Sequence, residues 1–132
     1  MEKINEKIHE YQLTGHTWDS IPELLHFQGE LATYSFYLAE QTAKSYSKYL
    51  MAEHTRKFAV ADSSINLSGT FAMNKSVAMA EVSTKGLKEI EIECERDYQT
   101  KKLQLNQINK ILEHLTMKIS CLKKEWENIG NQ

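Results

Sequence analysis

The stretch LNQINKILEHLTMKISCLKKEWENI, residues 105–129, decides the fold of this chain. Its large apolar side chains recur at alternating steps of three and four residues, at Leu105, Ile108, Leu112, Leu115, Ile119, Leu122, Trp126 and Ile129. A repeat that averages about 3.5 residues is the heptad pattern of a helix that packs lengthwise against another helix. The stretch therefore predicts a long helix with one apolar seam, and a second helix must cover that seam.

The covering helix is predicted at residues 21–61. Ser20, Pro22 and Glu23 have the pattern of a capping box with proline in the first turn, which marks a helix start. After them an apolar stripe follows the same three-and-four spacing, at Leu24, Phe27, Leu31, Tyr34 and Leu38. We therefore expect an all-α fold whose main part is a long antiparallel helical hairpin that resembles a coiled coil.

The two stripes predict a register for this hairpin. In an antiparallel pair the numbers of facing residues add to a constant, and Leu24 with Leu115 gives 139, as does Leu31 with Ile108. Half of this value places the turn at Gly69, inside the segment of the chain that is richest in turn-forming residues. We therefore expect Leu24 to face Leu115.

The remaining elements follow from the same patterns. Residues 2–14 predict a short amphipathic helix, which could cover the end of the seam, and residues 62–75 predict a loop. The middle of this loop could form a small β-hairpin or stay mobile. A second long helix is expected at 76–128, with a possible bend at Gly86. Together they form one expected helical domain over residues 1–132.

Apolar residues outside the shared stripe predict self-association. A hairpin of two helices buries little, and such thin arrangements usually need partner helices. We therefore expect a homo-oligomer. The residues left over are Phe36, Tyr37, Leu50, Met51, Phe58, Val60, Ile90, Ile92 and Ile111.

No motif indicates an enzyme. Glu53-His54 and Glu113-His114 are adjacent acid–histidine pairs, but neither has the second histidine that a His-Glu-x-x-His zinc site requires. The sequence also has no glycine-rich phosphate loop and no G-x-S-x-G element. We expect no catalytic residue, no cofactor site and no metal site.

Composition favours the cytoplasm. The sequence has no run of about 18 apolar residues that could span a membrane, and its first residues lack the apolar core of a secretory signal. Cys94 and Cys121 lie too far apart for a disulfide if one helix carries both, which favours two reduced thiols. We therefore expect a cytoplasmic protein without a membrane partner.

A mixture of basic and aromatic residues makes nucleic acid a candidate ligand. Between residues 41 and 61 there are four basic side chains and one acidic one. Cations follow phosphates and rings stack on bases when proteins hold single strands. The alternative is that these cations pair with the acidic run 89–97 across the hairpin. The candidate binding residues are Lys44, Tyr46, Lys48, Tyr49, Arg56 and Lys57, with Lys75 and Lys85 as weaker ones.

The order of parts resembles a known family. A helix with a Tyr/Lys-rich second half is followed by a polar glycine loop, by MNKSVAMAEVSTKG, and by a long charged helix that ends in LNQINKILEHLTMKISCLKKEW. This order resembles phage and prophage proteins of the UvsY-type recombination mediators over about residues 21–128. The resemblance implies a non-catalytic helical oligomer in a bacterial host cell. Its partners would be single-stranded DNA, a RecA-like recombinase and single-strand binding protein.

A second hypothesis needs no nucleic acid. The net charge of −2 gives no overall attraction to phosphate, and the leftover apolar residues suit a protein partner. The chain would then be a protein–protein adaptor or a structural coiled-coil oligomer, for example a phage inhibitor of a host protein.

Overall fold

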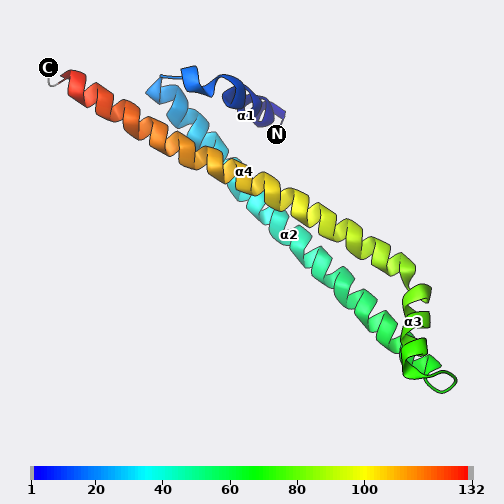
Figure 1. Ribbon diagram of the computed structural model, residues 1–132. Coiled ribbons are helices and arrows are strands. Elements are labelled where there is room, and N and C mark those ends of the chain that lie inside the picture. Colours follow the sequence, from blue (N-terminus) through cyan, green and yellow to red (C-terminus); the bar gives the residue numbers. More distant parts are fainter. Residues whose placement is uncertain (1, 131–132) are drawn as a thin grey trace. The chain divides into compact units, whose positions relative to one another are not determined.

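The computed structural model describes residues 2–130, and in this range it contains helices and no strand (Figure 1). The elements are α1 (Glu2–Thr14), the 3-10 turn η1 (Gly15–Thr17), α2 (Ile21–Leu67), α3 (Met73–Ser83) and α4 (Lys85–Gly130). The predicted all-α class, with two long helices packed against each other and a short N-terminal helix, is confirmed.

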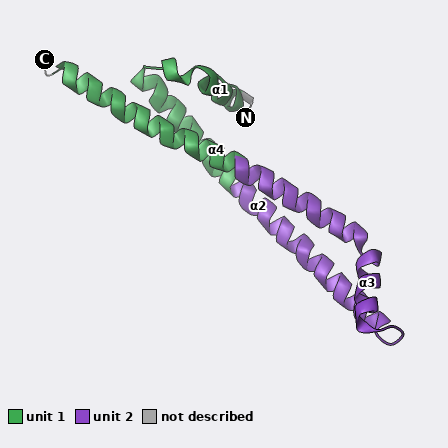
Figure 2. Ribbon diagram, viewed as in Figure 1, with its two compact units in different colours: residues 1–39, 104–132 green, residues 40–103 purple. Residues whose placement is uncertain are grey.

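The contacts divide the chain into two compact units (Figure 2). Unit 1 comprises residues 1–39 and 104–132, and so contains α1, the start of α2 and the end of α4. Unit 2 comprises residues 40–103, with the rest of α2, all of α3 and the start of α4. The expectation of a single domain over residues 1–132 stays a prediction.

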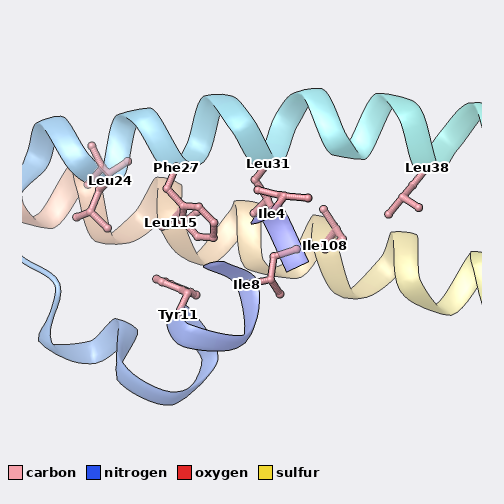
Figure 3. Close-up of a cluster of buried hydrophobic side chains, with 10 residues drawn as sticks. Ile4, Ile8, Tyr11, Leu24, Phe27, Leu31, Leu38, Ile108 and Leu115 are labelled. Atoms are coloured by element: carbon pink, nitrogen blue, oxygen red, sulfur yellow. The ribbon is translucent and has the colours of Figure 1, made fainter. Parts of the chain in front are cut away.

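Unit 1 holds the apolar core. Three helices contribute to it, and the α2 side chains point toward those of α1 and α4 (Figure 3). Removing this apolar surface from water is the main favourable term in the folding of the unit. The predicted stripes thus form the core. Its buried members are Ile4, Ile8, Tyr11, Leu24, Phe27, Leu31, Leu38, Ile108, Leu115 and Ile119.

The predicted register of the hairpin is wrong by about five residues. Gln28 Nε2 donates a hydrogen bond to Thr116 Oγ1 at 2.9 Å, and Ser35 Oγ donates to Asn109 Oδ1 at 2.9 Å. The numbers in each pair add to 144 rather than 139. The apolar stripes alone do not exclude this shift. When one helix slides by a turn or two along the other, apolar residues of a heptad seam still face apolar residues. The extra helix α3 in the connection moves the midpoint along the chain.

The short helix α1 is tied to both long helices of unit 1. Lys7 Nζ lies 2.8 Å from Glu30 Oε1 on α2, and Tyr11 Oη lies 2.7 Å from His114 Nδ1 on α4. Burial raises the pKa of the Tyr11 hydroxyl. These contacts place α1 over Ile108 to Ile119, whereas Trp126 and Ile129 at the end of the seam stay exposed.

Gly15 is needed where the chain leaves α1. A Cβ atom on this residue would lie 2.5 Å from Cδ2 of Tyr11. The Tyr11 ring cannot easily move, because it packs edge-on to Trp18 and beside Phe27. We expect Gly15→Ala to lower the free energy of unfolding by about 1–2 kcal/mol through overpacking, measured by urea denaturation. Gly130→Ala, where a Cβ meets no atom within 4 Å, is the control and should unfold like the wild type.

Unit 2 corrects the predicted boundaries. α2 continues to Leu67 instead of ending at 61, so the loop shrinks from 62–75 to 68–72. Ser63, Ser64 and Leu67 are half-buried in the helix, and this tertiary contact outweighs the low helix propensity of the polar run. The β-hairpin considered for this loop does not form, because residues 65–67 belong to α2, residues 68–72 form the turn and Met73 begins α3.

The second long helix is interrupted two residues before the expected bend. α3 ends at Ser83 and α4 begins at Lys85, so the break lies at Thr84 and not at Gly86. Thr84 Oγ1 donates to the carbonyl oxygen of Ala80 at 2.8 Å. A threonine side chain that bonds back to its own helix offers the backbone an alternative partner and favours a bend. Gly86 lies inside α4.

Candidate nucleic-acid interface

The candidate residues of α2 lie on different sides of the helix. Ser45, Tyr49 and Arg56 are buried or half-buried and face the interior of unit 2. Successive residues are turned by about 100° around a helix axis. Lys44 and Lys48 therefore flank this interior line on one side, and Tyr46 and Lys57 flank it on the other. The interleaved basic and aromatic sequence does not form one surface.

Lys44 and Lys48 remain exposed. Lys44 Nζ lies 3.3 Å from Glu40 Oε1 one turn earlier on the same helix. Such a solvent-exposed pair contributes roughly 0–1 kcal/mol, so the ammonium group stays free to exchange partners. Lys48 acts across unit 2 on Asp97, whose carboxyl pKa it helps to lower. This side of unit 2 therefore carries two exposed lysines, one of which attracts the Asp97 carboxylate.

A polar network joins α2 to α4 beside these lysines. Asp97 Oδ2 accepts hydrogen bonds from Ser45 Oγ at 2.9 Å and from Lys101 Nζ at 3.1 Å. Lys101 Nζ also donates to Ser45 Oγ at 2.9 Å. Lys101, with further help from Ser45, holds the pKa of Asp97 below its ordinary value of 3.8. The network satisfies the buried Ser45 hydroxyl and fixes the spacing of the two helices.

On the other side of the interior line three tyrosine rings come together. The Tyr46 and Tyr98 ring centroids are 4.9 Å apart, and the Tyr49 and Tyr98 rings are stacked at 6.4 Å. Lys102 Nζ lies 5.9 Å from the Tyr98 centroid, a cation–π distance. We call Tyr46, Tyr49, Tyr98 and Lys102 the tyrosine cluster. Sequence reasoning missed Tyr98 and Lys102 because the register of 139 does not bring Tyr98 opposite Tyr46, whereas a sum of 144 does.

Arg56 has a structural partner. Its guanidinium is hydrogen-bonded to Glu91 Oε2, and this contact raises the pKa of Arg56. The Glu91 carboxylate is buried and has Lys88 Nζ at 3.6 Å as a second cation. The alternative considered above, that cations pair across the hairpin, therefore holds for Arg56. Lys57, by contrast, pairs within its own helix, with Glu53 at 2.5 Å.

Lys75 and Lys85 lie on other elements. Lys75, on α3, has its Nζ 5.0 Å from the centre of the Phe71 ring, and Lys85 is the exposed first residue of α4. No hydrogen bond or ring contact among the described residues joins either lysine to the tyrosine cluster. They would act as separate contacts to a long ligand.

Charge favours unit 2 over the rest of the chain as an anion-binding surface. Residues 40–103 contain ten basic and nine acidic side chains, and the remaining residues contain six and nine. Unit 2 is therefore close to neutral with a slight positive excess. Such a surface binds a polyanion through a few well-placed cations rather than through a broad field.

Unit 1 has a surface depression of about 470 Å³ beside Trp18 and Phe27. Two of its lining residues bind Glu30, which lies outside the lining: Lys7 at 2.8 Å and His26 at 2.6 Å. The Lys7 hydrogen bond is the main reason that the pKa of Glu30 is lowered. The Lys7–Glu30 contact joins α1 to α2, and the His26–Glu30 contact lies within α2, so these titratable groups have structural partners.

Three comparisons bear on identity. No family model, no curated protein and no solved structure matches this chain. Within residues 2–130, no three His, Cys, Asp or Glu side chains form a group that could hold a metal ion. No helix in that part of the chain is long and apolar enough to cross a membrane. The geometry of unit 2 is therefore the basis on which a function can be inferred.

Proposed function

We propose that this chain is a non-enzymatic helical protein that binds single-stranded DNA through unit 2. The observation that carries the proposal is the tyrosine cluster, in which Tyr46 is 44% exposed and Lys102 lies beside the Tyr98 ring. Partly exposed aromatic rings with a cation beside them are the elements that hold unpaired bases and their phosphates.

The cluster suits a ligand without sequence preference. Every base has a π face, so stacking on Tyr46 does not select among bases. Tyr98 packs against Tyr46, and Tyr49 stacks on Tyr98 in turn. Lys57 lies on the same side of α2 as Tyr46. Its side chain is exposed, so its ion pair with Glu53 is weak and the ammonium group can neutralise a phosphate instead. Arg56 is paired with the buried Glu91 carboxylate, and this pair connects α2 to α4 behind the surface.

The biological role follows from the resemblance to UvsY-type mediators. In that role an oligomer of this chain, in the cytoplasm of a bacterial host cell, would hold single-stranded DNA while a RecA-like recombinase replaces single-strand binding protein. The long paired helices of the structure support this role, because the resemblance concerns the order of the helical elements.

A fluorescence-anisotropy titration with a labelled single-stranded oligonucleotide tests DNA binding. We expect Tyr46→Ala to weaken binding by about 5- to 100-fold, since base–aromatic stacking contributes about 1–3 kcal/mol per base. Lys102→Ala should weaken it less. Affinity should fall as salt rises, because phosphate contacts release counterions.

Tyr37→Ala is the matched control. Tyr37 is 42% exposed on the same helix, against 44% for Tyr46, but it lies in unit 1. This variant should bind DNA like the wild type. Equal losses in the two variants, or no binding by the wild type at low salt, would contradict the proposal.

A protein–protein adaptor or structural oligomer is the second candidate function. Exposed apolar side chains on α2 favour it, because Met51, Phe58 and Ile65 lie on the surface of unit 2. A flat DNA titration together with concentration-dependent self-association would select this candidate.

A further inference from the structure

An exposed apolar stripe runs along α2 within unit 2. Met51, Phe58 and Ile65 are 70%, 75% and 70% exposed. They are spaced by seven residues, so they occupy the same position in three successive heptads. Single exposed apolar residues are common on protein surfaces, but a row at heptad spacing is typical of a helix that packs against another helix.

Polar residues complete the stripe. Lys48, Thr55 and Asp62 each precede one of the apolar residues, so steps of three and four alternate over residues 48–65. We call residues 48, 51, 55, 58, 62 and 65 the outer seam. By helical geometry this seam is turned about 100° away from the interior line through Ser45. The helices α3 and α4 of unit 2 therefore leave it uncovered, as the exposed fractions show.

The outer seam is complementary to its own reverse. Reversal about Thr55 places Lys48 opposite Asp62, since their numbers add to 110, twice 55. Met51 and Phe58 add to 109, so they lie within one residue, about 1.5 Å along the axis, of facing each other. Opposite charges then face each other at both ends of residues 48–62, with Met51 and Phe58 between them, and Ile65 lies beyond the last facing pair. A parallel pairing would instead place Lys48 beside Lys48 and Asp62 beside Asp62, which is unfavourable.

We propose that the outer seam is the contact between two copies of this chain, packed antiparallel about a two-fold axis at Thr55. A two-fold contact uses the same surface on both copies, and so requires this kind of self-complementarity. Neither Lys48 nor Asp62 forms an ion pair within 4.0 Å among the described residues, and the attraction between Lys48 and Asp97 acts over a longer distance.

The contact is small and polar at its centre. Two large apolar residues per chain, Met51 and Phe58, flank Thr55 on the axis, and such a contact buries much less than the roughly 800 Å² per partner of a standard stable interface. We therefore expect a reversible dimer with a dissociation constant on the order of 10 μM. This dimer contact is separate from the proposed DNA-binding surface, because Tyr46 lies on the opposite side of α2 from the outer seam.

Sedimentation velocity over a range of concentrations tests the dimer. The wild type should change from one chain to two as the concentration rises through the micromolar range. Phe58→Asp should remain monomeric at all concentrations, with an unchanged circular dichroism spectrum because the side chain is exposed. Phe36→Asp is the matched control, since Phe36 is 80% exposed on the same helix but lies outside the outer seam. It should dimerise like the wild type.

Charge reversal tests the antiparallel register. Lys48→Glu should weaken the dimer at least fivefold by placing a glutamate opposite Asp62, and the added substitution Asp62→Lys should restore it. A monomeric wild type at about 100 μM, well above the dissociation constant expected for so small a contact, would overturn the proposal. It would assign the outer seam to a different partner. Equal losses in Phe58→Asp and Phe36→Asp would also overturn it, and so would a double charge reversal without rescue.

Discussion

Leu115→Asp is expected to unfold unit 1. Leu115 is fully buried in the cluster that also contains Leu24, Phe27 and Tyr11 (Figure 3). Removing a buried leucine costs about 2–5 kcal/mol, and a carboxylate placed there without a partner costs several kcal/mol more. The sum is comparable to the whole stability of a typical domain, about 5–15 kcal/mol. Far-UV circular dichroism should show a large loss of helix at 25 °C.

Met117→Asp is the control for this prediction. Met117 lies two residues away on the same helix and is exposed. Its replacement should change the free energy of unfolding by less than about 0.5 kcal/mol. Leu115→Ala should fall between the two, with a lower melting temperature but a folded chain. If both aspartate variants melted together, the burial of Leu115 would be wrong.

The fold was predictable where apolar periodicity is strong. Leu24, Phe27 and Leu31 were expected on the inner face of the first long helix. Ile108 and Leu115 were expected on the inner face of the second, and all five are buried. Periodicity identifies a face because a helix repeats every 3.6 residues. It does not identify a register, because one heptad resembles the next. The five-residue error in register arose from this ambiguity.

The connection between the long helices was harder to predict. Asp62, Ser63, Ser64 and Gly69 are turn-forming residue types, and they suggested a long loop. In the structure the first three stay helical because α2 packs there against its own unit, and the turn narrows to residues 68–72. Local propensity is a weak guide wherever tertiary contacts favour a different conformation.

The candidate site shows the same limit. Lys44, Tyr46 and Lys48 were chosen by residue type alone. That choice did not consider that Tyr46 lies on a different side of α2 from the two lysines. Tyr98 and Lys102 complete the tyrosine cluster from α4, more than fifty positions along the chain from Tyr46. Only the observed register brings them together. A prediction whose register is wrong by about five residues therefore misses the site residues that come from the partner helix, although it still identifies the core.

Arg56→Met is expected to destabilise unit 2 more than any other substitution of a candidate binding residue. It leaves the buried Glu91 carboxylate without its main partner, although Lys88 remains at 3.6 Å. The buried carboxylate would then lack its main partner and Lys88 compensates only in part, so we expect a lower melting temperature. Thermal denaturation followed by circular dichroism measures the change.

Lys57→Met separates this effect from a general loss of charge. Lys57 is the next residue, and its pair with Glu53 is exposed on the lysine side, so its replacement should hardly change the melting temperature. The double substitution of Arg56 by Met and Glu91 by Leu should recover most of the lost stability, because two packed apolar side chains replace a buried ion pair at little net cost. Failure of this rescue would mean that Arg56 stabilises unit 2 through contacts other than Glu91. DNA binding by the rescued variant then reports whether Arg56 also touches the ligand: binding like the wild type would assign it a supporting role alone.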